Sequence, residues 1–263
     1  MWTYTSFAGV NLPTNAPSHD ISAGPAASRM VSIAGGAQWD ALGANEAIRG
    51  PKTATCRCMI VAASTAAADA IYDDWEALCL TRGTLVRTRG DGSTTQWCTA
   101  RLVSVQANRT AQTQRHLPVT LDFQIVSGCW YGASLQTTTK NNCANGVNNL
   151  PTISYGGNKN QRNVTITITA TGNSITNTTV QNLTTGHTWG FSGTIPAGQS
   201  LVVNCGAKSV LLNGANAYAS FVKPTTKADW FMLSPGNNSV RVTLTTAGGV
   251  AHVASVAYYE AFG

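Results

Sequence analysis

The chain has 263 residues, of which 43% are hydrophobic and 11% are charged, and its formal net charge at pH 7 is +6. Disordered chains combine low hydrophobicity with high net charge, so this composition indicates a folded protein of one large β domain or two domains. The basic residues are dispersed and do not gather among aromatic residues, which argues against sequence-specific recognition of nucleic acid.

The seven cysteines are odd in number and widely spaced, unlike the cysteines of a disulfide scaffold. Cys56 and Cys58 are expected on one face of a strand as small core residues. No metal or cofactor is expected, because zinc-ligand spacings are absent. The sequence also lacks a secretory signal and an apolar run of membrane length, which predicts assembly in a reducing cytoplasm without membrane insertion.

The first part of the chain, residues 1–131, is predicted to be an antiparallel β domain closed by one helix. A strand candidate at 3–12 is followed by Pro- and Gly-rich turns, and a second strand is expected at 53–62, where apolar residues alternate. Residues 85–98 flank a Gly-Asp-Gly turn and predict a hairpin. Residues 117–125 alternate strictly between apolar and polar side chains, which favours another strand.

One helix is expected at about 65–81. Ser64 or Thr65 is the candidate N-cap, and Gly83 is the expected left-handed stop signal. The acidic residues of this segment are expected to lie largely on its solvated face. The buried stripe is expected to hold residues at helical spacing, extended by two alanines: Ile71, Trp75, Leu78 and Cys79, with Ala67 and Ala68.

Residues 132–149 have almost no large apolar side chains, which predicts a linker between two domains. In residues 150–263, short strands alternate with Gly and Asn turns, which is typical of a jelly-roll β-sandwich. Residues 230–233 are expected to form an apolar strand that turns at Pro235-Gly236 into an alternating strand at 239–245. The predicted fold class is therefore mainly β.

Catalytic motifs are absent from the sequence, which has no nucleophile elbow, phosphate loop or His-Glu-x-x-His. Beyond the expected linker only Asp229 and Glu260 are carboxylates, too few to make a glycosidase pair expected there. The sequence therefore predicts a protein that is not an enzyme.

Three motifs follow one another near the C-terminus: GTIPAGQSLVVNC at 193–205, VLLNG at 210–214 and WFMLSPGNN at 230–238. In this order before a last strand, they resemble the C-terminal half of the distal tail proteins of long-tailed bacteriophages. The first half resembles the ring-forming domain of that family by its pattern of a β-sandwich, one helix and a hairpin. The resemblance covers most of the chain and is weakest over residues 1–50, and the linker at 132–149 departs from the family.

The resemblance implies a structural virion protein that forms a homohexameric ring at the distal end of a phage tail. Such a ring joins the tail tube protein to the tail-tip hub protein and to receptor-binding proteins. The resemblance implies that the ring is assembled in the cytoplasm of the bacterial host and that its final location is the tail tip of the virion. The resemblance also implies an N-terminal sandwich-like ring domain and an outward C-terminal jelly-roll or galectin-like sandwich. A tail tube subunit is less favoured, because tube proteins usually need no such second sandwich.

Two sets of residues are candidate functional sites. The hairpin at 85–98 mixes apolar and basic side chains, and we expect it to contribute the subunit contact through Val86, Arg87, Arg89 and Trp97. The alternative function is a carbohydrate-binding or receptor-binding adaptor of a phage tail, in which sugar rings stack on aromatic side chains. Its candidates are also commonly buried residue types: Trp189, Tyr218, Trp230 and Tyr258.

Overall fold

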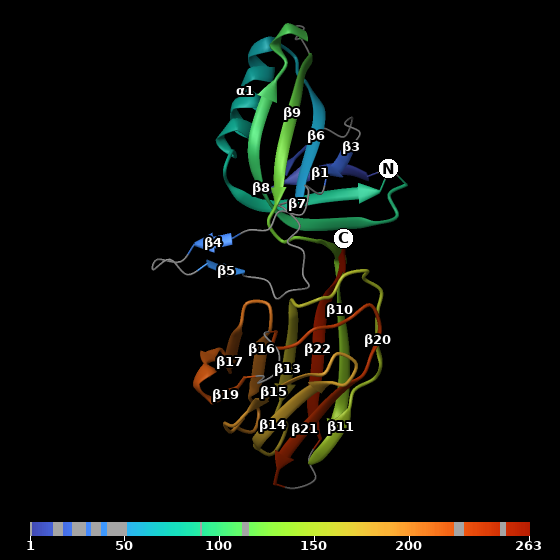
Figure 1. The fold of residues 1–263 in the computed structure, drawn as a ribbon, viewed down its shortest axis with the longest axis vertical. Helices are drawn as coiled ribbons and strands as arrows, with labels where there is room; N and C mark the ends of the chain where they lie inside the picture. Colours follow the sequence, from blue (N-terminus) through green and yellow to red (C-terminus); the bar gives the residue numbers. More distant parts are fainter. Residues whose placement is uncertain are drawn as a thin grey trace. The chain divides into compact units, whose positions relative to one another are not determined.

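The computed structural model describes residues 2–12, 18–22, 30–32, 38–40, 52–89, 91–111, 116–223, 229–247 and 251–263. The chain divides into two compact units, Met1–Trp130 and Tyr131–Gly263 (Figure 1). In the described residues both units are built from antiparallel strands, and one α-helix lies in the first unit. The prediction of a mainly β fold is therefore confirmed.

Unit 1 is organised around one antiparallel sheet with the strand order β2-β1-β7-β8-β9-β6-β3. The long strand β8 pairs with β7 along its first half and with β9 along its second half, and a bulge lies between Leu102 and Ser104. Because β8 belongs to both halves, the sheet bends along this strand (Figure 1). The strands are β1 (Trp2–Phe7), β2 (Val10–Asn11), β3 (Ser18–Ser22), β6 (Lys52–Val61), β7 (Arg82–Arg89), β8 (Thr95–Ala107) and β9 (His116–Ile125).

Among the described residues of unit 1, a small sheet and a short 3-10 helix lie outside this sheet, as does the α-helix. Strands β4 (Met30–Ser32) and β5 (Gln38–Asp40) pair with each other as a separate two-stranded sheet. A short 3-10 helix, η1 (Arg109–Ala111), lies between β8 and β9.

The alternating patterns predict burial in unit 1 correctly. Every second residue of β9 from Leu117 to Ile125 is buried, as are Cys56 and Cys58 on β6. The strand expected at 3–12 is two short strands instead of one. The chain turns at Ala8 and Gly9, which both have positive φ, so β2 folds back onto β1.

Helix α1 (Thr65–Ala77) begins as predicted, because the Ser64 side chain accepts a hydrogen bond from the Ala67 N–H at 3.2 Å. It ends four residues before the expected end. Leu78 is the C-cap, and Leu80 takes the left-handed conformation at φ 67° while its N–H donates to the Leu102 carbonyl at 2.7 Å. The expected stop at Gly83 is wrong, because that residue already lies in β7.

The buried face of α1 agrees with the predicted stripe at Ala68 and Trp75, which are both buried, and differs from it at Ile71, which is exposed. The helix lies against β6, β8 and β9, and the half-buried Tyr72 donates its hydroxyl proton to the Val105 carbonyl of β8 at 3.3 Å. Ile71 is one position before Tyr72 and therefore points about 100° away from it around the helix.

Unit 2 is a sandwich of two antiparallel sheets. The first has the order β18-β17-β16-β13-β22-β10 and the second the order β11-β21-β14-β15-β19. The first sheet contains β10 (Trp130–Cys143), β13 (Val164–Thr169), β16 (Ser200–Asn204), β17 (Ser209–Leu212), β18 (Ala215–Asn216) and β22 (His252–Phe262). The second contains β11 (Gly146–Asn149), β14 (Ile175–Asn182), β15 (His187–Phe191), β19 (Phe221–Val222) and β21 (Val240–Thr246).

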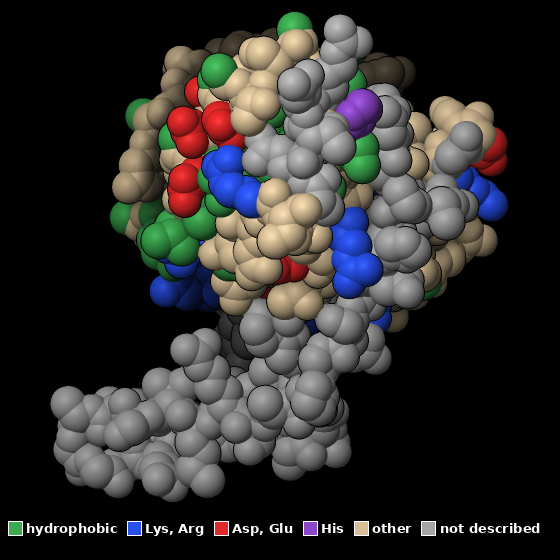
Figure 2. Space-filling view, turned by 90° about the horizontal axis from the view of Figure 1, so that it is seen from above, with side chains coloured by type: hydrophobic (Ala, Val, Ile, Leu, Met, Phe, Trp, Pro, Cys, Tyr) green, Lys and Arg blue, Asp and Glu red, His purple; other side chains and the backbone are tan. Residues whose placement is uncertain are grey.

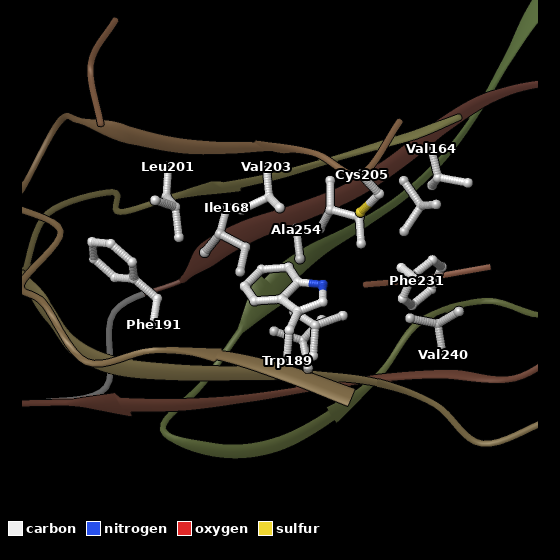
Figure 3. Packing of buried hydrophobic residues seen from close by; sticks show 14 of the residues in the cluster. Val164, Ile168, Trp189, Phe191, Leu201, Val203, Cys205, Phe231, Val240 and Ala254 are labelled. Atoms are coloured by element: carbon white, nitrogen blue, oxygen red, sulfur yellow. The ribbon is translucent and has the colours of Figure 1, made fainter. Parts of the chain in front are cut away.

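The core of unit 2 lies between these sheets. Trp189 and Phe191 of β15 point toward Ile168, Leu201 and Val203 of the opposite sheet (Figure 3). All five side chains are at most 2% exposed. Strands β12 (Ile153–Tyr155) and β20 (Gly236–Asn238) form a small additional sheet, and η2 (Tyr218–Ser220) precedes β19.

The linker expected at 132–149 is wrong, because these residues form most of β10 and all of β11. The side chains at 133–142 are exposed or half-buried, so this part of β10 has no buried face. Its backbone is ordered by pairing along β22. The segment therefore needs no large apolar residues, and their absence does not indicate a linker.

The hairpin expected around Pro235 is formed differently. Residues 230–233 are not a strand, and Leu233 makes a single β-bridge with Gln161. Gly236 has φ 91°, as the predicted turn requires, but β20 pairs with β12. The alternating strand predicted at 239–245 is β21.

Candidate functional site

The β7–β8 hairpin presents two different faces. Val86 and Trp97 are directly opposite each other and half-buried, so they lie on the outer face. Thr88 and Thr95 form the next pair on this face, and their hydroxyl oxygens are 3.3 Å apart. Two residues of the predicted subunit contact, Val86 and Trp97, are thus accessible as a pair.

Arg87 lies on the inner face and is only 7% exposed, so its assignment as a surface contact is wrong. Its Nε and Nη2 atoms donate to the Gln96 side-chain oxygen at 3.1 and 2.6 Å, and its guanidinium is 3.9 Å from the Trp130 ring centroid. Burial lowers the pKa of Arg87 to about 10, which leaves the side chain charged at neutral pH. Side chains two residues apart in a strand lie on the same face, so Arg87 is expected on the inner face together with Leu85.

Arg89 is exposed at the end of β7. Its Nε atom is 3.6 Å from a carboxylate oxygen of Asp91, and both side chains are more than half exposed. Asp91 also accepts hydrogen bonds from the backbone N–H and hydroxyl of Ser93, and these bonds lower the pKa of its carboxyl group. Because an exposed ion pair adds little stability, Arg89 remains available to a partner.

Three of the four aromatic residues proposed for sugar stacking are buried. Trp189 is 1% exposed, and Trp230 and Tyr258 are each 5% exposed, so these three candidates are wrong. Tyr218 is 36% exposed, and its ring centroid lies 5.7 Å from that of Trp230. The four candidates therefore do not form one exposed platform.

Two residues that the sequence analysis did not select lie on the outer face of the same hairpin. Arg82 and Arg101 are directly opposite each other on β7 and β8, and Arg82 is exposed. The Nε atom of Arg101 donates to the Leu80 carbonyl at 2.9 Å. Their even spacing from Val86 and Trp97 is the sequence signal that places them on this face.

Among the described residues, no group of three or more His, Cys, Asp or Glu side chains is arranged to hold a metal ion. In the same residues, no helix is both long and apolar enough to cross a membrane.

The fold defines a two-unit β protein in which a sheet with one helix precedes a β-sandwich. Residues 157–262 match the family model described as the siphovirus-type tail component, C-terminal domain. A comparison with curated protein sequences finds no match.

Among solved structures, the crystal structure of the Dit protein (gp 19.1) of phage SPP1 is similar over 100% of both chains. The TM-score is 0.63 and the identity 13%. That protein is described as a paradigm of the hub adsorption apparatus in phages that infect Gram-positive bacteria. Two structures of the phage P2 baseplate in its activated conformation, with Ca and with Sr, cover 97% of this chain and 90% of theirs, at 11% identity and a TM-score of 0.40.

The resemblance to distal tail proteins of siphoviruses is thereby confirmed. The C-terminal unit carries the siphovirus-type tail component domain, and the Dit fold extends over both units. The tail-component match covers residues 157–262, and the likeness to the SPP1 Dit protein over the whole chain is one of fold.

Proposed function

We propose that this protein forms a homohexameric ring at the distal end of a phage tail. The ring would join the tail tube protein to the tail-tip hub protein and to the receptor-binding proteins. The proposal is supported by the tail-component domain at 157–262 and by the fold shared with the SPP1 Dit protein over the whole chain. The role is structural rather than catalytic, with assembly in the host cytoplasm and a final location at the tail tip of the virion.

The observation that carries the ring proposal is the outer face of the β7–β8 hairpin. Val86 and Trp97 form a half-buried pair between uncharged threonine pairs, Thr84–Thr99 and Thr88–Thr95. An aromatic residue with a polar edge and an apolar body is a frequent anchor of protein interfaces. The face thus has an apolar centre and a polar surround, as protein contacts do.

The ring is tested by measuring the mass of the purified protein with light scattering. The wild type should have six times the 27.5 kDa mass of one chain. Deleting Gly90-Asp91-Gly92 and shortening the hairpin should give single chains, as should Trp97→Ala. Tyr218→Ala is the matched control, because it removes a partly exposed aromatic side chain from unit 2 and should leave the ring intact.

Two outcomes would count against this function. A wild-type protein that stays a single chain at high concentration would contradict the ring, and an unchanged hexamer after hairpin shortening would contradict the contact. The adaptor alternative retains Tyr218 alone of its four aromatic candidates. Binding to a glycan array that Tyr218→Ala abolishes would favour that alternative.

A further inference from the structure

The outer face of β7–β8 is basic at one end. Its four cross-strand pairs are Arg82–Arg101, Thr84–Thr99, Val86–Trp97 and Thr88–Thr95, and none of these residues is acidic. Like charges directly opposite each other on neighbouring strands destabilise a sheet. The Arg82–Arg101 pair therefore costs stability within one chain, and an anionic partner surface would offset that cost.

Helix α1 carries the opposite charge. Asp69, Asp73 and Glu76 follow each other at four- and three-residue spacing, so they form one stripe along the helix. Asp69 pairs with Arg109 at 2.6 Å, while Asp73 and Glu76 are exposed and form no ion pair among the described residues. Acidic side chains gather on one face of unit 1, next to a basic one (Figure 2).

Two effects make this acidic stripe unfavourable in a single chain. Neighbouring acids at these spacings repel each other, and Glu76 lies in the last turn, where the helix dipole disfavours negative charge. No basic residue lies in that last turn to compensate. A cationic surface placed against the stripe would offset both effects.

We propose that the outer face of β7–β8 in one copy docks on the acidic stripe of α1 in the next copy of the ring. This inference rests on the proposed ring and names the two surfaces of its subunit contact. A closed ring joins two different patches of the same chain, and these two patches have opposite charge. Exposed alanines at 66, 70 and 77 line the helix beside the stripe, and their short side chains leave room there for Trp97.

The test uses two charge-reversed full-length proteins. The first carries Arg82→Glu and Arg101→Glu, and the second carries Asp73→Lys and Glu76→Lys. Each alone should lose the sixfold mass, because like charges then face each other at every contact. An equimolar mixture should recover the sixfold mass, because alternating copies again place opposite charges together.

Recovery in the mixture also shows that both variants are folded. Asp74→Lys is the matched control, because residue 74 lies on the opposite flank of the same helix and the ring should remain. Raising the salt concentration from about 0.05 to 0.5 M should weaken the wild-type ring, since screening shortens the reach of exposed charges.

The outcomes separate this inference from the proposed function. A wild-type single chain would contradict the ring itself. A wild-type ring with both variants still hexameric would overturn the docking inference and leave the ring standing. Variants that lose the ring but do not recover it when mixed would also overturn the inference, because the two surfaces would then not face each other.

Discussion

The side chain of Asn238 closes the loop that enters β21, and replacing it should destabilise unit 2. Asn238 is fully buried and makes five hydrogen bonds. Its oxygen accepts from the backbone N–H and hydroxyl of Ser234 and from the Asn182 amide. Its nitrogen donates to the carbonyls of Ser234 and Gly236 at 2.8 and 3.1 Å.

Asn238→Ala removes all of these bonds and leaves several backbone groups without a partner. A hydrogen bond contributes about 1 kcal/mol net, and an unsatisfied buried group costs about 1–3 kcal/mol. Ser234 is half-buried and Gly236 exposed, so water replaces part of what is lost. We therefore expect the free energy of unfolding of unit 2 to fall by about 3 kcal/mol.

The turn that leads into β11 at Ala144–Asn148 provides an internal comparison. Asn148 accepts from the Ala144 N–H at 2.9 Å and donates to the carbonyls of Ala144 and Gly146 at 2.8 and 3.0 Å. These contacts repeat the Ser234 and Gly236 contacts of Asn238, without the bonds to Asn182 and to a hydroxyl. Asn148→Ala should therefore cost about 1–2 kcal/mol, less than Asn238→Ala.

Hydrogen exchange of peptides from β14 and β21, followed by mass spectrometry, measures the stability of unit 2 separately from unit 1. A loss of about 3 kcal/mol corresponds to exchange roughly a hundredfold faster. Exchange in Asn238→Ala within threefold of wild type would refute the argument. Equal effects of the two substitutions would show that the additional bonds of Asn238 contribute nothing.

Three further predictions concern other buried positions. Burial lowers the pKa of His252, whose Nδ1 accepts from the Thr171 N–H at 3.2 Å, so the unfolded chain binds more protons. The free energy of unfolding should thus fall as the pH drops below about 6.5, by up to about 1.4 kcal/mol per pH unit. His252→Gln should flatten this pH dependence when stability is measured in an acid titration. Arg87→Ala should lower the stability of unit 1 by about 2–4 kcal/mol in urea denaturation, because it removes packing and hydrogen bonds from a buried site. Gly83→Ala should cost about 1–3 kcal/mol in thermal melts, since its Cβ would lie 2.7 Å from that of Ala8.

Local patterns predict the strands of unit 1 and the sandwich of unit 2 because alternation directly reports one buried face. The same rule places Val86 and Trp97 together and puts Arg87 inside. The composition of the hairpin alone favours Arg87 as a contact residue, whereas its alternation excludes Arg87 and includes Arg82. Composition suggests that a segment forms a contact, but only register shows which side chains reach it.

The position of aromatic residues depends on contacts distant in sequence. Trp189 and Trp230 are the same residue types that bind sugars, and nothing adjacent to them in the chain shows that the opposite sheet covers them. Phe221, which arrives from another strand, lies 5.6 Å from Trp189 and 4.3 Å from Trp230 between ring centroids. Local sequence therefore could not separate these core residues from the exposed Tyr218.

The two asparagine loops explain why one motif was informative and its counterpart was not. Ala144-x-Gly146-x-Asn148 and Ser234-x-Gly236-x-Asn238 share a glycine with positive φ and an asparagine that bonds back to the first residue. Large apolar residues precede the second loop, and together they predict a turn before a strand. Polar residues precede the first loop, and their composition predicts a linker. In both loops the glycine and the asparagine lie in a short strand, β11 in the first and β20 in the second, and β21 follows the second loop.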